Sequence, residues 1–230
     1  TGPCGPDTEM FYWTGELPPP EKFDPADKRW VEIWNDVFME YNKTAEGKYE
    51  PLAQRNVDTG MGLERVTAIL QGKTSCYETE IFAPIFAKLD EIRGTQPVSG
   101  PRSPSERIIA DHLRAATFIL ADGITPGKVD QPYVLRRLIR RAVRFGMELG
   151  MQEGFTAEIG KVVIDQYAEV YPELKQNEAF VLEQFKLEET RFARTLRQGE
   201  REFEKILESI EKYNLPKIID SKRAFKLYDT

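Results

Sequence analysis

The sequence predicts an α+β fold in which a mixed first half is followed by an all-helical second half. The first half is rich in aromatic residues, prolines and turn signals. A stretch rich in Gly, Pro and Ser follows at residues 94–106 and has poor periodicity, which is typical of a linker or an exposed loop. Beyond it, apolar residues recur at helical spacing. We therefore expect two domains, residues 1–98 and 99–230.

The first half contains a weak strand signal, a long loop and one ambiguous segment. "EMFYW" alternates weakly and predicts a strand, whereas "GELPPPEKFDP" predicts a loop because three consecutive prolines cannot donate to a ladder. "VEIWNDVFMEYN" is compatible with a helix or a strand. At helical spacing, Trp30, Trp34, Phe38 and Tyr41 form one stripe. At period two, Asn35 shares one face with Val31, Ile33, Val37, Met39 and Tyr41, and alternation with aromatic content favours a strand.

Helices are expected in the rest of the chain. "GLERVTAILQG" predicts a helix ending at Gly72, and "YETEIFAPIFAKLDEI" predicts another with Pro84 near a start or kink. In the second half, Ser103 and Glu106 form a capping box with proline at the first helical position. Further helices are expected over 133–149, from near Thr156, and over 174–213.

Composition excludes several classes of protein. The 230 residues carry a formal charge of −6, so no global basic excess indicates nucleic acid. Two separated cysteines, Cys4 and Cys76, and a single histidine, His112, make a zinc site within the chain or a disulfide framework unexpected. No apolar run reaches the length of a membrane span and no signal peptide begins the chain. We expect a reduced, cytoplasmic protein without a membrane partner.

The segment "VDTGMGLER" is the first candidate site. If it begins as a strand, Gly60 and Gly62 lie on the same side and leave that face bare for a ligand. A helix then begins at Leu63, and its N-terminal N–H groups together with Arg65 favour a phosphate. A nucleotide triphosphate site is one interpretation. A glycine turn leading into a surface helix with an ordinary arginine is the other.

A basic helix is the second candidate site. It carries five arginines within nine residues, with one row at i, i+4 spacing and two more beside it: Arg136, Arg137, Arg140, Arg141 and Arg144. On an acidic protein this is a concentrated site for a phosphate backbone, and RNA is one interpretation. A helix surface covered with salt bridges is the alternative.

Several segments together resemble one enzyme family. "GMGLER" is similar to motif 3 of class II aminoacyl-tRNA synthetases, and the whole of "VDTGMGLER" resembles the alanyl-tRNA synthetases. "TGPCGPDTE", "EIWNDVFMEYN", "RIIADHLRAATFILADGITP", "YVLRRLIRRAVRFG" and "AFKLYDT" resemble that family's segments in the family's order, from the first residue to the last. The resemblance implies that the first half is the later part of a class II catalytic domain, an antiparallel sheet flanked by helices.

The resemblance implies roles for the first site. Arg65 would hold the ATP γ-phosphate, and Asp58 would face the ammonium group of alanine. Gly60 and Gly62 would form the floor of the nucleotide and alanine pocket. Without the family, Asp58 is equally well read as a turn or helix-start acid. Two more residues would join them, Asn35 and Glu9.

Alternatives stay open for the residues around that site. Asn35 would bind alanine or its adenylate, or would bond the neighbouring backbone. Val37 would shape a small side-chain pocket, or would be a simple core residue. Glu9 would line the site, or would be solvated at the head of a strand.

The resemblance implies that the helical domain binds the acceptor stem of alanine tRNA. The family reads a G·U pair with an Asn before "RGYVLRR" and with an Asp that corresponds to Asp229. The Asn position falls at or near Asp130, which accepts hydrogen bonds but cannot donate them as an amide does. Gln131 could substitute for it. His112 is expected to be structural.

The expected function is ATP-dependent activation of alanine, with Mg²⁺ in the substrate complex, and transfer to tRNA(Ala) during translation. The chain looks like a piece of this ligase, because motifs 1 and 2 would precede it and editing and oligomerisation regions would follow. Alone it is expected to be inactive. A non-catalytic tRNA-binding paralogue is the alternative function, and a class II ligase for another amino acid is a weaker one.

Overall fold

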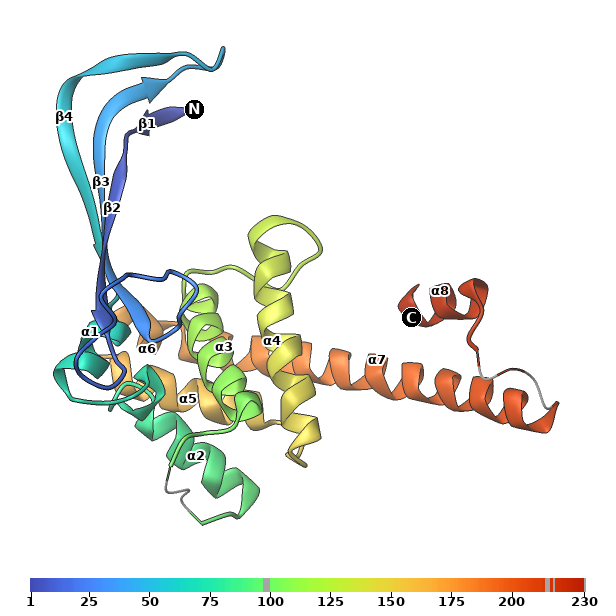
Figure 1. Cartoon of the computed structure of the whole chain (residues 1–230). Helices are drawn as coiled ribbons and strands as arrows, with labels where there is room; N and C mark the ends of the chain where they lie inside the picture. The colour runs from blue at the N-terminus through green and yellow to red at the C-terminus, as the bar shows by residue number, and fades with distance from the viewer. Residues whose placement is uncertain (97–99, 214–215, 217, 230) are drawn as a thin grey trace. The chain divides into compact units, whose positions relative to one another are not determined.

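The computed structural model describes residues 1–96, 100–213, 216 and 218–229, of which residues 228 and 229 are described by their backbone alone. It divides into two compact units, Thr1–Ala83 and Pro84–Thr230 (Figure 1). The first unit is a sheet followed by a short helix, and the second is helical, which confirms the predicted α+β fold class.

The first unit is built on an antiparallel sheet. Its strands are β1 (Gly2–Cys4), β2 (Asp7–Trp13), β3 (Trp30–Lys43) and β4 (Tyr49–Met61). β3 is the long central strand: β1 and β2 pair with successive parts of one edge, and β4 pairs with the other edge. The ambiguous segment after residue 30 is therefore a strand, as its alternation favoured. The predicted loop between β2 and β3 contains no helix or strand.

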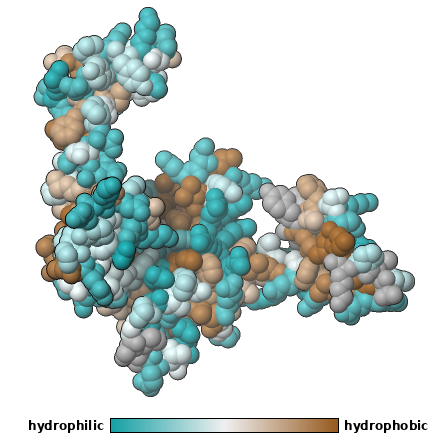
Figure 2. All heavy atoms as spheres, viewed as in Figure 1, coloured by the Kyte–Doolittle hydropathy of each residue, from teal (hydrophilic) through white to brown (hydrophobic). Residues whose placement is uncertain are grey.

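The sheet is open to solvent on its own. No residue from Thr1 to Thr67 is buried, and Ala68 is the first buried residue along the chain. Polar and apolar side chains are interspersed over the sheet (Figure 2), with large apolar residues such as Met10, Tyr49 and Val57 about half exposed. Both faces of the sheet are consequently available for contacts.

The glycine segment ends the sheet and begins α1 (Leu63–Leu70). Gly62 is the residue before the helix, in an extended conformation, and its N–H donates to the carbonyl of Ile33 at 3.0 Å. β4 ends at Met61, and Gly62 extends its backbone pairing with β3 by one residue. That Gly60 and Gly62 together form a bare face for a ligand stays a prediction. At the other end, Gly72 follows the helix with φ of 64°, a left-handed conformation that glycine adopts without strain.

The second unit is helical. Its longer elements are α2 (Ala83–Arg93), α3 (Pro104–Ala121), α4 (Asp130–Glu148), α5 (Phe155–Tyr167), α6 (Pro172–Gln176), α7 (Glu178–Lys212) and α8 (Ser221–Asp229). A single 3₁₀ turn, Cys76–Glu78, precedes them in the first unit. The helix expected over 77–92 is therefore a turn followed by a helix with Pro84 in its first turn. The expected helix over 174–213 is two helices, because the chain turns at Asn177.

The capping box predicted for the third helix is present. The Ser103 side chain accepts from the Glu106 N–H at 3.3 Å, and the Glu106 carboxylate accepts from the Ser103 N–H at 2.9 Å. Pro104 occupies the first turn, where its missing N–H costs nothing. The linker expected over 94–106 therefore overlaps the first residues of α3, which begins at Pro104. Its residues 97–99 lie outside the described part of the chain.

A cluster of buried charges joins α2 to the start of α3. Arg102 makes two hydrogen bonds to Asp90, at 2.6 and 2.7 Å, and contacts Glu106 at 3.3 Å, while Arg93 contacts Glu106 at 2.9 Å. These contacts tie α2 to α3, and both helices lie in the second compact unit, which begins at Pro84. The domain boundary at residue 98 stays a prediction, since it concerns functional domains rather than compact units.

The core of the second unit is close-packed. Large apolar side chains such as Ile85, Leu113 and Phe185 are less than 2% exposed, and each contributes about 1.5–3 kcal/mol. Two helix glycines permit close approach of aromatic rings: a Cβ on Gly146 would lie 2.3 Å from Phe155, and one on Gly160 would lie 2.7 Å from Phe185. The packing of this core determines which faces of α3, α4 and α7 stay outside it.

Candidate functional site

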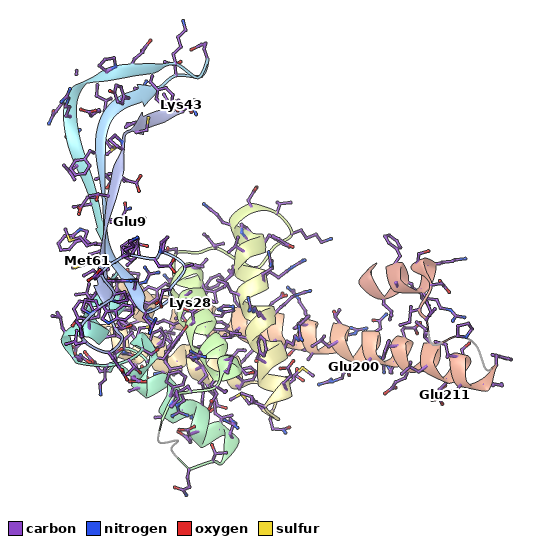
Figure 3. The ribbon with its side chains drawn as sticks, viewed as in Figure 1. Glu9, Lys28, Lys43, Met61, Glu200 and Glu211 are labelled. Atoms are coloured by element: carbon purple, nitrogen blue, oxygen red, sulfur yellow. The ribbon has the colours of Figure 1, made fainter. Side chains whose placement is uncertain are left out.

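The register of the sheet brings the predicted alanine-binding residues onto one face. Glu9 pairs with Asn35, and Asn35 pairs with Gly60. In the next row on the same face, Val37 lies between Asp7 and Asp58. Five predicted site residues therefore share one surface, which we call the substrate face: Glu9, Asn35, Val37, Asp58 and Gly60. Glu9 lies toward the end of the sheet at which Met61 leads into α1 (Figure 3).

The opposite face carries a different set of residues. There Thr59 accepts a hydrogen bond from the Trp34 indole N–H and donates one to the Asp36 carboxylate at 2.6 Å. These side-chain contacts add to the backbone pairing of β3 with β4. Thr59 and Asp58 are neighbours in sequence but point to opposite sides, so only Asp58 belongs to the substrate face.

The polar groups of the substrate face are accessible. Asp58, Gly60 and Glu9 are exposed, and Asn35 is half-buried. The Asn35 amide donates to the Glu9 carboxylate at 3.5 Å, a long hydrogen bond between neighbouring strands. The partner of Asn35 is thus a side chain rather than the backbone partner considered above. Val37 is also half-buried and sits between two carboxylates instead of in a core.

Gly60 leaves the floor of this face bare. A Cβ built on Gly60 would meet no atom within 4 Å, so its missing side chain leaves open space above the strand. At Gly62 the corresponding space is occupied, because the Arg65 side chain lies 3.2 Å from the Cβ position. The two glycines of the motif therefore do different things: one bares the sheet, and the other accommodates Arg65.

Arg65 is held against the end of β3. Its Nη1 donates to the Glu32 carbonyl at 3.0 Å and lies 3.6 Å from the Glu32 carboxylate. Glu32 pairs with Phe11 across a register shift in β3, which turns Glu32 to the same side as Glu9. The Arg65 side chain is 55% exposed and is therefore accessible to a ligand.

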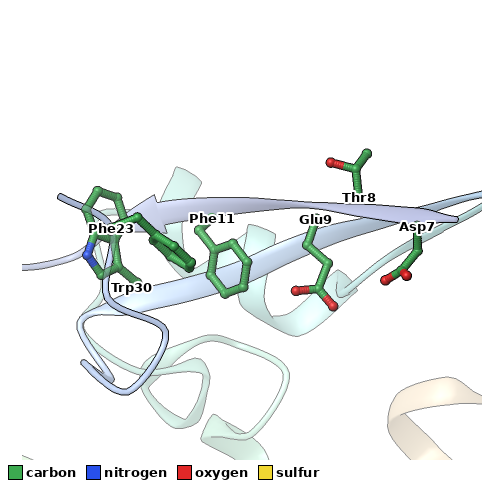
Figure 4. A pocket seen from close by; sticks show the side chains of 6 residues that line it. All are labelled: Asp7, Thr8, Glu9, Phe11, Phe23 and Trp30. Atoms are coloured by element: carbon green, nitrogen blue, oxygen red, sulfur yellow. The ribbon is translucent and has the colours of Figure 1, made fainter.

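A pocket next to Glu9 was not predicted. It has a volume of about 540 Å³ and is lined by Asp7, Thr8, Glu9, Phe11, Phe23 and Trp30. Asp7, Glu9 and Phe11 project from the same side of β2, while Thr8 projects from the other (Figure 4). The Phe11 and Phe23 rings are 4.8 Å apart and the Phe23 and Trp30 rings 5.6 Å apart. Alternation in β2 could have indicated Phe11, but Phe23 comes from the loop and carried no sequence signal.

The second candidate site lies on α4. Helical spacing predicts that Leu135, Leu138, Ile139, Ala142 and Val143 face a core, and four of them are buried. Leu138 is the exception, because it is half-buried and lies on the side of the arginines. The five arginines line a groove of about 510 Å³, here called the basic groove. Its other lining residues are His112 of α3, Tyr133, Val134 and Leu138 of α4, and Phe192 of α7.

The arginines of the basic groove differ in their partners. The Arg140 Nε donates to the Glu188 carboxylate at 2.6 Å, and Arg144 pairs with Glu148 at 3.3 Å on the exposed surface. Within the described part of the chain, Arg136, Arg137 and Arg141 have no ion pair, although the first two lie near the Tyr133 ring. The salt-bridged alternative therefore holds for only two of the five arginines.

The residues expected to read the acceptor stem lie at helix ends. α4 begins at Asp130 rather than near Tyr133, so exposed Asp130 and Gln131 form its first turn. Asp130 has φ of 52°, a left-handed conformation that Asp and Asn adopt more readily than other non-glycine residues. Asp229 is the last residue of α8, and its side chain lies outside the described residues. His112 lines the basic groove and its Nδ1 lies 2.9 Å from the Asp111 carboxylate.

Two general features bear on cofactors and membranes. Among the residues that the structure describes, no three His, Cys, Asp or Glu side chains are grouped so that they could hold a metal ion. In the same residues, no helix combines the length and apolar character needed to cross a membrane.

An antiparallel sheet that carries the glycine–arginine segment and is followed by helices fits the fold class expected of a class II synthetase. All 230 residues match the family described as tRNA synthetases class II (A), and the chain belongs to that family. It is 46% identical over its whole length to an alanine–tRNA ligase of Treponema pallidum, and it covers 39% of that protein.

Other relatives agree. An alanine–tRNA ligase of Thermotoga sp. strain RQ2 is 46% identical and one of Borrelia hermsii is 43% identical, each over 100% of this chain. The chain covers 27% and 39% of these two proteins, so it spans well under half the length of the relatives named here.

Proposed function

We propose that this chain supplies the alanine-binding sheet face and the tRNA-binding helices of an alanine–tRNA ligase. The observation that carries the proposal is the row of Glu9, Asn35 and Gly60, flanked by Asp58, on one accessible face of the sheet. Family membership and the alanine–tRNA ligase relatives support the same reading. The reaction would join the alanine carboxylate to the α-phosphate of ATP with release of pyrophosphate, and would then pass the alanyl group to tRNA(Ala) with release of AMP.

The residues of the substrate face, together with Arg65, match the two reactants, alanine and ATP. Asp58 offers a carboxylate for the alanine ammonium group, in a row next to Asn35 and Gly60. Gly60 lets the ligand lie directly against the backbone. Arg65, held at the edge of the same face, offers its remaining N–H groups to the ATP γ-phosphate.

Catalysis by these residues would rest on positioning and charge neutralisation. The chain offers carboxylate, amide and guanidinium groups on a rigid sheet, which orient the two reactants. Mg²⁺ would enter with ATP, because this ion is bound largely by substrate phosphates and water. In the second unit, the arginines of the basic groove would hold the phosphates of the acceptor stem.

A thermal-shift experiment with amino acids tests the alanine part of the proposal. Alanine together with ATP and Mg²⁺ should raise the melting temperature of the chain more than glycine or serine does. Asp58→Asn should abolish the alanine shift, because an amide has no charge to pair with the ammonium group.

The matched control is Thr59→Val, on the neighbouring residue and the opposite face. It should lower the melting temperature through loss of the Trp34 and Asp36 contacts, yet keep the alanine shift. Equal shifts with alanine, glycine and serine would point to another class II ligase. No shift with any amino acid, together with salt-dependent binding of tRNA(Ala), would favour the non-catalytic tRNA-binding module.

A further inference from the structure

Arg140 differs from the other arginines of the basic groove because a buried carboxylate holds it. The Arg140 Nε donates to Glu188 Oε1 at 2.6 Å, and the Glu188 side chain is 3% exposed. One turn further along α7, the Phe192 ring lies 5.0 Å from the centre of the Arg140 guanidinium. α7 therefore fixes the guanidinium with two groups, a carboxylate and an aromatic ring.

This arrangement uses the inner side of the guanidinium and leaves the outer side for a ligand. Only Nε is bonded to Glu188, and 28% of the Arg140 side chain remains exposed where it lines the groove. The two Nη groups form a planar fork that matches two oxygens of a phosphate. Arg136 and Arg144 lie one turn to either side, so adjacent phosphates of one strand would meet further cations.

We propose that Glu188 is a positioning residue for RNA binding, which presets Arg140 as a phosphodiester subsite of the basic groove. This inference rests on the proposed tRNA-binding function of the second unit. A free arginine loses rotamer freedom when it binds, whereas one already held by Glu188 and Phe192 has lost most of it on folding. Presetting one such side chain is worth about 2- to 10-fold in affinity.

A pure charge effect and a positioning effect predict opposite changes in RNA affinity when Glu188 is removed. If only charge matters, removing a carboxylate from the groove strengthens the binding of a polyanion. If Glu188 acts through Arg140, Glu188→Ala weakens binding, because the guanidinium is no longer fixed. Glu188→Gln keeps an oxygen acceptor for Nε and loses the charge, so it should bind RNA at least as tightly as the wild type.

The test is the affinity of the chain for transcribed tRNA(Ala), measured by fluorescence anisotropy over a series of salt concentrations. Arg140→Ala should reduce the affinity about fivefold near 0.15 M salt and lower the slope of log K against log salt by about 0.9. Glu188→Ala should reduce the affinity at least about twofold but no more than Arg140→Ala does, because it acts through Arg140. The Glu188→Ala, Arg140→Ala double variant should bind no more weakly than Arg140→Ala alone.

The neighbouring residue provides the matched control. Glu189 is 2% exposed on the same helix, but it accepts from the Gly154 N–H at 2.9 Å and from Thr156, at the start of α5. Glu189→Gln should therefore change the stability and leave the RNA affinity unchanged. Circular dichroism at the assay temperature identifies variants that are folded.

Arg140→Lys keeps the test decisive if Glu188→Ala does not fold. Lysine retains the charge but lacks the fork, so the positioning account expects a several-fold loss of affinity, whereas a pure charge effect expects none. Glu188→Ala binding as tightly as the wild type, or Arg140→Lys binding unchanged, would overturn the inference. Absence of any salt-dependent tRNA binding by the wild-type chain would instead contradict the proposed tRNA-binding function on which the inference rests.

Discussion

Replacing Gly60 by alanine separates the stability of the sheet from ligand binding on it. The added Cβ meets no atom within 4 Å, so the folded sheet accommodates it without strain. Glycine within a strand is about 0.5–1 kcal/mol less favourable than alanine, because it loses more backbone entropy on folding. Gly60→Ala should therefore raise the free energy of unfolding by about 0.5–1 kcal/mol.

Binding should change in the opposite direction. If the adenylate lies directly on the Gly60 backbone, the methyl group occupies space that the ligand needs. Overpacking of this kind costs about 1–3 kcal/mol, which corresponds to about 5- to 150-fold in the dissociation constant. Urea denaturation measures the first quantity, and calorimetric titration with a non-hydrolysable alanyl-adenylate analogue measures the second.

Gly199→Ala is the matched control for this pair of measurements. Gly199 lies in α7, and a Cβ there also meets no atom within 4 Å. The substitution should add about 1 kcal/mol of stability through helix propensity and leave the affinity for the analogue unchanged. A Gly60→Ala variant that binds the analogue as tightly as the wild type would refute the role of Gly60 as the floor of the site.

Two further predictions concern the charge cluster between α2 and α3. Arg102→Met should lower the free energy of unfolding by about 3–5 kcal/mol, because it removes the arginine that pairs with the buried Asp90 and Glu106 carboxylates. Arg197→Met, which breaks an exposed ion pair, is the control and should lower the free energy of unfolding by at most about 1 kcal/mol in the same urea titration. Burial raises the pKa of Glu106, but hydrogen bonds from Ser103 and the charges of Arg102 and Arg93 outweigh it and lower the pKa below 4.5. The stability that this carboxylate contributes is thus fully present above its unfolded pKa of about 4.5 and is lost as the pH falls through its lower folded pKa. If this group dominates, the urea midpoint should be the same at pH 6 and pH 7 and should fall as the pH is lowered below 4.5.

Local sequence signals predicted most of the helices. The capping box at Ser103 and the apolar spacing of α4 depend on residues within one or two turns, and both are observed. The break between α6 and α7 has a tertiary cause, since the Asn177 side chain donates to the Ala121 carbonyl of α3 at 2.9 Å. No pattern within the segment 174–213 could reveal that contact.

The sheet was harder to predict because its strands are exposed. Residues 49–57 of β4 show no clear alternation, and their pairing with β3 determines their conformation. Alternation placed Asn35 and Val37 on one face, but the register that aligns Glu9, Asn35 and Gly60 depends on three strands at once. The resemblance indicated these residues together, and their common face is what the structure adds.

Within the basic groove, sequence spacing placed the arginines on one side of α4 but could not distinguish among them. Glu188 and Phe192 lie about 50 residues further along the chain, and their contact with Arg140 depends on the packing of α7 against α4. His112 likewise reaches the groove from α3. Contacts between separate helices decide which arginine is held and which are accessible.

The central claim is that alanine and its adenylate bind on the substrate face of the sheet. Nuclear magnetic resonance of the ¹⁵N-labelled chain, titrated with the alanyl-adenylate analogue, tests it most directly. The account predicts saturable shifts of the amide signals of Asn35, Asp58 and Gly60, with the signal of Gly199 unmoved. Saturable shifts confined to the second unit, with these three signals unchanged, would contradict it.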